Sequence, residues 1–185
     1  MVYNSHLNLL LFHSFLQLRY HFLLFAFYSV YNNKFQLAII KLEKGEEDID
    51  IYLEKKHDLI VRAKTLISKE IKKEEFFTDL NDSYEQLNHF DKHDLLKKLY
   101  NELFKIIDDH EKLLKSDSIT SILEELNTNE ENIVGAIKFY NDTVVEFNQL
   151  SVSFPSSIIA LIKRYKKKEF YRNEKREIFE VLNTK

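Results

Sequence analysis

The residues with the clearest potential for chemistry are two histidines and two aspartates near the middle of the chain. His89 and His93 are four positions apart, with Asp91 and Asp94 close by. Imidazole nitrogens and carboxylates are zinc ligands, and residues four apart share one face of a helix. Zinc requires three or four such ligands, and the sequence has no H-E-x-x-H pattern. We therefore expect no metal site here. Instead we expect Asp91 to lie in a solvated turn that precedes the next helix.

Composition excludes several other classes of active site. The 185 residues include two glycines, one proline and no cysteine. Without cysteine there is no disulfide, thiolate zinc site or thiol nucleophile. Walker loops, dinucleotide-binding turns and nucleophile elbows need several glycines in a short window, whereas Gly45 and Gly135 are far apart. We predict a protein without catalytic residues, cofactor-binding residues or metal ligands.

The densest group of charges is basic and lies near the C-terminus, interleaved with aromatic residues. We call it the basic patch; it consists of Lys163, Arg164, Lys166, Lys167 and Lys168. Such a patch can bind acidic protein, anionic lipid or nucleic acid, or stay solvated. We expect the order of helices to place Pro155 and this patch at the end of the bundle remote from the N-terminus. That placement favours a solvated tail or a protein partner over lipid, and no nucleic acid is expected.

Charge divides the chain into three segments. Residues 1–33 carry one charged side chain, Arg19, whereas residues 34–150 have a net charge of −9 and residues 151–185 a net charge of +5. We predict an apolar N-terminal segment over 1–33, a helical bundle over 34–171 and a charged tail over 172–185.

Within residues 1–33, residues 9–31 are long enough as a helix to cross the hydrocarbon layer of a bilayer. We call residues 9–31 the apolar segment. Arg19 makes the span marginal, and His13, Gln17 and His21 form a polar stripe that a second copy or another protein could satisfy. We favour a membrane anchor, which also allows homo-oligomers. The alternatives are an interfacial helix, the core helix of a soluble cytosolic adaptor, and a signal peptide, whose charged start and cleavage site are missing.

The orientation of the anchor follows from the basic residues on either side of it. Lys34, Lys41 and Lys44 come after the apolar segment, and no lysine or arginine precedes it. The positive-inside rule therefore places the C-terminal body in the cytoplasm.

Apolar residues after residue 33 recur with helical spacing. Tyr52, Leu59 and Leu66 form one row, and Leu53, Ile60 and Ile67 another. The pattern predicts a long helix over 34–74, continuous with the apolar segment, then helices over 76–89, from about 92 to 113 with His110 in the core, and over 118–152. A break near Asn127 stays open because Thr128 and Glu131 could form a capping box, and Pro155 starts a short helix ending near 165.

Two blocks of sequence resemble the LemA family. Residues 139–148 read FYNDTVVEFN and residues 153–160 read SFPSSIIA, similar to the signature of that family. Residues 46–60, EEDIDIYLEKKHDLI, resemble its second block. The chain departs from the family pattern where Val61 and Ser157 replace the usual proline and asparagine.

The resemblance implies a bacterial, single-pass membrane protein with no established catalytic activity. The expected fold is all-α, with an N-terminal transmembrane helix followed by an elongated antiparallel bundle of about four helices. We expect a scaffold or protein-interaction module at the cytoplasmic face of the cell membrane, with an unknown protein partner. The candidate interaction or structural residues are those of the signature: Tyr140, Asn141, Asp142, Asn148, Phe154 and Pro155.

Overall fold

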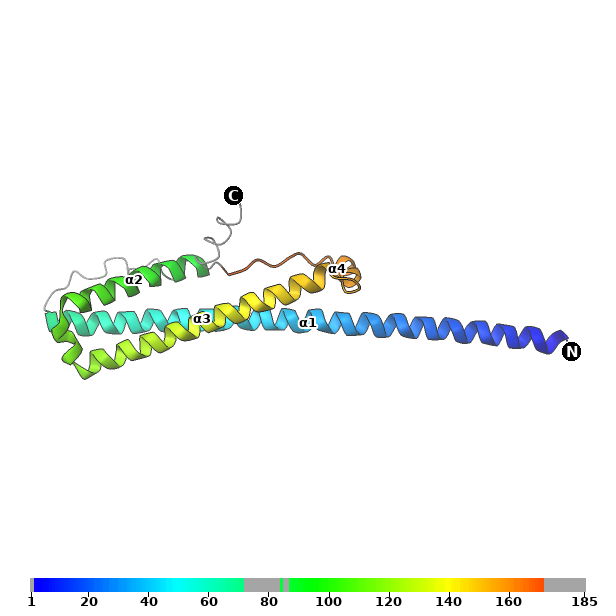
Figure 1. Ribbon diagram of the computed structural model, residues 1–185, viewed down its shortest axis with the longest axis horizontal. Coiled ribbons are helices and arrows are strands. Elements are labelled where there is room, and N and C mark those ends of the chain that lie inside the picture. Colours follow the sequence, from blue (N-terminus) through cyan, green and yellow to red (C-terminus); the bar gives the residue numbers. More distant parts are fainter. Residues whose placement is uncertain (1, 72–83, 85–86, 172–185) are drawn as a thin grey trace. The chain divides into compact units, whose positions relative to one another are not determined.

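Every regular element in the described part of this protein is a helix. The computed structural model describes residues 2–71, 84 and 87–171 (Figure 1). These residues form α1 (Val2–Ile71), α2 (His89–Asp109), the 3-10 helix η3 (Glu111–Lys115), α3 (Asp117–Val152) and α4 (Ser157–Lys163), and none of them forms a strand. The predicted all-α class is confirmed.

α1 runs from the apolar segment into the charged part of the chain without a break, over 70 residues. The predicted continuity is confirmed, because nothing before Ile71 removes a helical hydrogen bond as a proline would. The described part of this helix reaches Ile71, and residues 72–74 of the helix expected over 34–74 lie outside the described residues. The helix expected over 76–89 lies largely outside the described residues; Leu87 and Asn88, which are described, are not helical.

Contacts divide the chain into two compact units. Unit 1 consists of Met1–Leu42 and Thr143–Glu169, and unit 2 of Glu43–Asp142 and Phe170–Lys185. α1 and α3 each contribute to both units. The domains expected from charge stay a prediction, and residues 172–185 of the expected tail lie outside the described residues.

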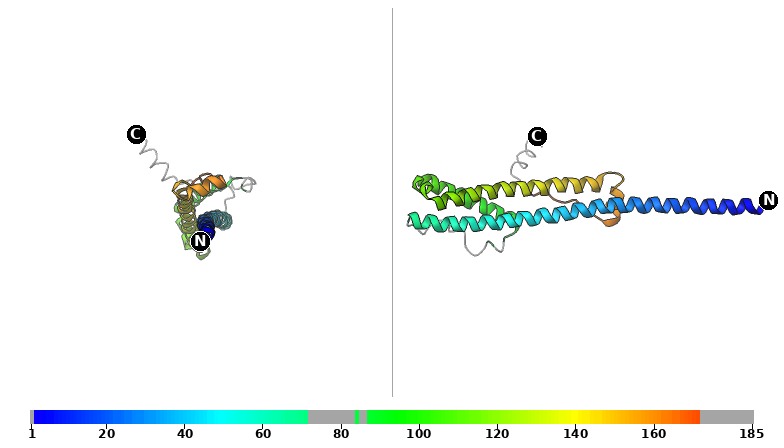
Figure 2. Two further views of the ribbon diagram at one scale, coloured as in Figure 1. Left: turned by 90° about the vertical axis from the view of Figure 1, so that its right-hand side faces the viewer. Right: turned by 90° about the horizontal axis from the view of Figure 1, so that it is seen from below.

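In unit 2, α1, α2 and α3 lie side by side, and α3 runs antiparallel to the other two (Figures 1 and 2). Contacts along α1 and α3 agree with this direction. Near the start of unit 2 Glu46 accepts a hydrogen bond from Tyr140, and further along α1 Arg62 lies 3.7 Å from the Glu125 carboxylate.

One of the two rows of apolar residues predicted for α1 lies entirely in the core of unit 2, whereas in the other row Leu59 is buried and Tyr52 and Leu66 are half-buried. Leu53, Ile60 and Ile67 of α1 are each at most 1% exposed. Burying one such side chain contributes roughly 1.5–3 kcal/mol, so these rows account for much of the attraction between the helices. The buried residues of α2 and α3 include those expected: Leu96, Leu99, Leu103, Ile106, Ile133, Ile137 and Tyr140.

The turn expected at Asp91 is wrong, because α2 already begins at His89. Asn88 caps it: its side-chain oxygen accepts hydrogen bonds from the backbone N–H groups of Phe90 and Asp91, each at 3.0 Å. Asn88 Nδ2 also donates to the Asp91 carboxylate at 2.6 Å. Asparagine is among the best N-cap residues, and an acidic side chain in the first turn favours the helix. Asp91 therefore supports a helix start rather than a turn.

The expected positions of His110 and Thr128 also need correction. His110 is exposed and caps the end of α2, with its Nδ1 3.0 Å from the Ile106 carbonyl oxygen, so it is not a core residue. Thr128 lies inside an unbroken α3 and donates to the Glu124 carbonyl at 3.0 Å. Because its hydroxyl bonds one turn back along the same helix, it caps no new helix and there is no break near Asn127.

Unit 1 is organised around a cluster of three aromatic rings. Phe35 of α1 and Phe147 of α3 are almost fully buried, with ring centroids 5.6 Å apart. Tyr165, just after α4, packs on both rings at 4.9 Å and 5.7 Å. Its hydroxyl also accepts a hydrogen bond from Gln36 Nε2 at 3.2 Å. The cluster holds the end of α3 and the chain after α4 against α1.

This arrangement overturns the expected location of Pro155 and the basic patch. Within unit 1, Lys41 pairs with Glu146 at 2.9 Å, and Lys163 of α4 lies beside Tyr28, further toward the N-terminus of α1. α3 therefore returns toward the apolar segment instead of leading away from it. Helical periodicity is the same in either direction, which is why the sequence pattern did not reveal the error.

Candidate functional site

The candidate site lies in unit 1, where α4 and the basic patch meet the end of the apolar segment. The Lys163 ammonium is 5.9 Å from the centre of the Tyr28 ring, and Lys34 lies 5.2 Å from the ring of Tyr31. A cation over an aromatic face is attracted by the ring quadrupole. Both tyrosines are in the last turn of the apolar segment, so Lys163 and Lys34 lie at that end of it.

All five residues of the basic patch have exposed side chains. Arg164 ends α4 in the left-handed conformation, with φ 55°, and its N–H bonds back to α4 carbonyl groups. After Arg164 the chain has no regular secondary structure, and Lys166, Lys167 and Lys168 follow one another at the surface.

α4 has two unlike faces. Ile159 and Ala160 are buried, at 1% and 5% exposure, and attach the helix to unit 1. The opposite face is apolar but exposed: Ile158 is 44%, Leu161 80% and Ile162 62% exposed. These three are spaced i, i+3 and i+4, which puts them on one side of the helix.

Phe154, in the turn before α4, is also exposed, at 84%. The sequence analysis singled out Phe154 but missed the α4 residues. Their helical spacing directly ahead of five basic residues is the signal that could have found them.

Asn148 and Asn141 of the signature hold the chain that follows α4. In unit 1 the Asn148 side chain accepts from the Lys168 N–H at 2.8 Å and donates to the Lys168 carbonyl at 2.9 Å. In unit 2 Asn141 accepts from the Tyr171 N–H at 2.7 Å and donates to its carbonyl at 3.3 Å. An amide side chain can satisfy the N–H and C=O of one residue at once, which explains asparagine at both positions.

The other signature residues differ in burial. Tyr140 is buried in unit 2, and its hydroxyl donates a hydrogen bond to the Glu46 carboxylate at 3.2 Å. Tyr140 also packs closely on Gly45: a Cβ atom added to Gly45 would lie 3.2 Å from the Cβ atom of Tyr140. Asp142 is exposed and pairs with Lys138 one turn away. Such surface pairs contribute little to stability, so Asp142 remains available to a partner. Pro155 is partly exposed in the turn before α4.

A buried charge lies in the centre of unit 2. Lys56 is 1% exposed, and its ammonium is 2.5 Å from the Glu130 carboxylate and 4.7 Å from the centre of the Tyr100 ring. Burial lowers the pKa of His93, and the nearby positive charge of Lys56 lowers it further. Burial, together with Asp50 and Asp94, raises the pKa of Tyr171, whose ring packs on His93 at 5.9 Å. The ion pair and rings link all three helices.

Metal ligands do not converge in the part of the chain that the structure describes. Among the described residues no three histidine or acidic side chains are placed to hold a metal ion. Asp91 is engaged at the α2 cap, and His93 packs against Tyr171.

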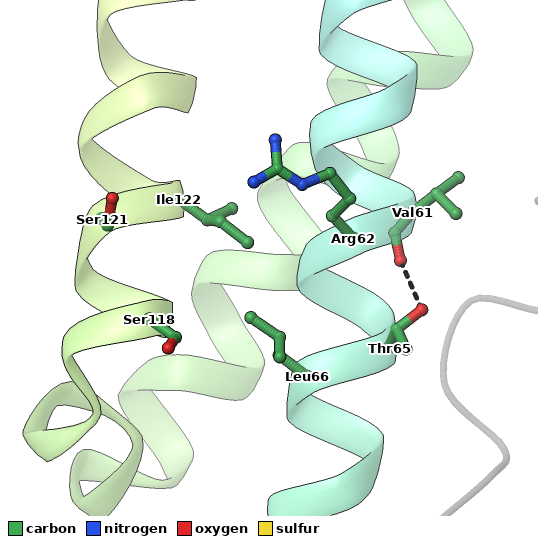
Figure 3. Close-up of a pocket in the computed structure, with 7 residues that line it drawn as sticks. All are labelled: Val61, Arg62, Thr65, Leu66, Ser118, Ser121 and Ile122. Carbon is green, nitrogen blue, oxygen red and sulfur yellow. Dashed lines mark hydrogen bonds between the residues drawn. The ribbon is translucent and has the colours of Figure 1, made fainter.

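A pocket between α1 and the start of α3 in unit 2 offers little chemistry (Figure 3). Its only charged lining residue is Arg62, which faces Glu125. Thr65 donates to the Val61 carbonyl at 2.9 Å. The lining contains no carboxylate or imidazole that could act as an acid or base; it consists of Val61, Arg62, Thr65, Leu66, Ser118, Ser121 and Ile122.

In the described part of the chain these features are those of a helical protein, with exposed apolar side chains on the first part of α1 and on α4 and with an exposed basic patch. A family model described as LemA family matches residues 45–183, which is most of the chain. The protein belongs to the LemA family, as the two signature blocks predicted. No curated protein and no solved structure matches it.

The test for membrane-spanning helices gives a separate result. Among the described residues, no single helix combines the length and apolar composition of a span. α3 and α4 meet the criterion only as a pair, bent by 92° at the break between them.

The Asn148 hydrogen bonds should control the order of the segment after α4. We expect Asn148→Ala to remove two hydrogen bonds, each worth about 0.5–1.5 kcal/mol, and to speed hydrogen exchange at the Lys168 amide roughly tenfold. The control is Gln149→Ala, an exposed neighbour on α3. Unchanged exchange at Lys168 in Asn148→Ala would show that the segment is held by other contacts.

The lowered pKa of His93 should make stability depend on pH. In the unfolded chain His93 takes up a proton near pH 6.5, whereas in the folded protein it does so only at lower pH. The unfolded state therefore binds more protons below pH 6.5, and stability falls as the pH drops from there toward the folded pKa. We expect the urea midpoint to decline over this range.

A histidine substitution checks the origin of this pH dependence. His93→Gln should flatten the decline of the urea midpoint, whereas His110→Gln, at the exposed end of α2, should keep it. An equal decline in the wild type and His93→Gln would contradict the assignment.

Proposed function

We propose that this LemA family protein is a membrane-anchored helical scaffold without catalytic activity. The observation that carries the proposal is the exposure of the apolar residues in the first part of α1. Leu18, Phe22 and Phe25 are 67%, 69% and 69% exposed, among many similar neighbours. An apolar surface of this extent requires cover, and a helix of this length can obtain it from a bilayer.

The anchor places its charged flank in the cytoplasm. Lys34, Lys41 and Lys44 follow the apolar segment, and Lys163 of the basic patch lies at the same end of it in unit 1. Both groups support the orientation expected from the positive-inside rule. The bacterial cell membrane is therefore the proposed location, with the body of the protein at its cytoplasmic face.

Arg19 and the polar stripe point to association within the membrane. His13, Gln17 and His21 are exposed on α1. The Arg19 guanidinium lies 5.9 Å from the centre of the Phe15 ring. Polar side chains within a span gain most from a partner helix that satisfies them. We propose that a second copy of the chain or a partner protein supplies this helix.

Membrane fractionation tests the anchor. We expect the wild-type protein to stay in the pellet after carbonate extraction. Phe22→Lys should move it to the supernatant, because a lysine at the centre of a span costs about 2.5–3.5 kcal/mol, or roughly a hundredfold in partitioning. Val134→Lys is the matched control, since Val134 is 61% exposed on α3, outside the apolar segment.

Extraction of the wild-type protein by carbonate would contradict the anchor and favour the adaptor alternative. The scaffold role is tested separately by crosslinking in cells, in which the intact protein should reproducibly yield the same associated protein. Failure to recover one would contradict the scaffold role and leave the anchor unaffected.

A further inference from the structure

We propose that α4 and the basic patch form a second membrane contact, which lies in the surface of a bilayer rich in anionic lipid. The proposal rests on the proposed anchor for the position of α4 near the bilayer. It concerns residues outside the anchor, and its test has an independent outcome.

The first argument is position. The Lys163 ammonium is 5.9 Å from the ring of Tyr28, in the last turn of the apolar segment. Tyrosines are typical of the membrane–water interface, which places Lys163 at the level of the lipid headgroups. Headgroup charge acts on basic side chains within a Debye length of about 8 Å at physiological salt, so it reaches Lys163 at that level.

The second argument is the direction of α4. Along unit 1, α3 runs antiparallel beside α1, as the contacts of Phe35 with Phe147 and of Lys41 with Glu146 together show. α4 is bent by 92° from α3. If α1 crosses a bilayer, α4 therefore lies close to the bilayer plane, as interfacial amphipathic helices do.

The third argument is chemical complementarity. Leu161, Ile162 and Phe154 are 80%, 62% and 84% exposed, so a set of large apolar side chains gathers beside five exposed basic residues. A bilayer of anionic lipid matches both properties, with hydrocarbon for the apolar face and headgroups for the charges. A purely acidic surface would match the charges but would leave the apolar side chains exposed.

The absence of tryptophan from the sequence permits a direct test. In Leu161→Trp the new indole is the only one in the chain, and it replaces an exposed side chain without removing a core contact. The full-length variant is reconstituted into vesicles of phosphatidylcholine and phosphatidylglycerol containing dibrominated phosphatidylcholine, which quenches nearby tryptophan. We expect blue-shifted emission and strong quenching.

Two further single-tryptophan variants distinguish the proposals. Val134→Trp, on the exposed side of α3 in unit 2, should stay unquenched. Phe22→Trp reports on the anchor alone. Quenching of Phe22→Trp without quenching of Leu161→Trp overturns the second contact and leaves the anchor intact, whereas the reverse result overturns the anchor and supports the second contact.

A charge variant tests the role of the basic patch. Replacing Lys166, Lys167 and Lys168 with glutamine in the Leu161→Trp background should reduce quenching in vesicles containing phosphatidylglycerol and leave it unchanged in pure phosphatidylcholine. The backbone bonds of Lys168 to Asn148 do not involve the lysine side chain, so the fold of the segment is kept. Equal quenching with and without the three lysines would overturn the preference for anionic lipid.

Discussion

Packing of Phe35, Phe147 and Tyr165 is the interaction on which the arrangement of unit 1 depends. Phe35 and Phe147 are almost fully buried, and Tyr165 contacts both rings. Aromatic pairs at such distances contribute about 0.5–1.5 kcal/mol beyond the burial of their area. Because these rings come from α1, α3 and the chain after α4, their contact brings the basic patch to the end of the apolar segment.

The two asparagines of the family signature complete this arrangement from α3. Asn148 binds the backbone of Lys168 in unit 1, and Asn141 binds the backbone of Tyr171 in unit 2. This segment has no regular secondary structure and so no helical hydrogen bonds of its own, and each amide supplies a donor and an acceptor. Much of the signature is thus explained by the fold, and Asp142 and Phe154 remain as its exposed members.

Periodicity and capping determine how much of the fold could be predicted. The row of Leu53, Ile60 and Ile67 and the apolar positions of α3 were predictable, because a helix buries residues at fixed spacing whatever its surroundings. The start of α2 was also encoded, in Asn88 followed by Asp91, but the charged residues after it were interpreted as a turn. Asp91 instead accepts a hydrogen bond from Asn88 within the cap.

The direction of α3 could not be predicted, because it depends on contacts between residues far apart in the sequence, such as Phe35 with Phe147. The location of the basic patch depends on that direction. The exposed face of α4 had a detectable spacing, but only the burial of Ile159 and Ala160 shows which face packs on unit 1.

The central claim is that the end of α4 lies beside the last turn of the apolar segment, and crosslinking through cysteine tests it most directly. The sequence has no cysteine, so Tyr28→Cys with Lys163→Cys introduces the only thiols. With a bis-maleimide reagent of about 8 Å span, the account predicts an efficient intramolecular crosslink for this pair. The control pair is Leu16→Cys with Lys163→Cys, in which the cysteine on α1 lies about 18 Å from position 28 toward the N-terminus. This pair should give no crosslink. Failure of the Tyr28 pair to crosslink, or equal crosslinking of both pairs, would contradict the account.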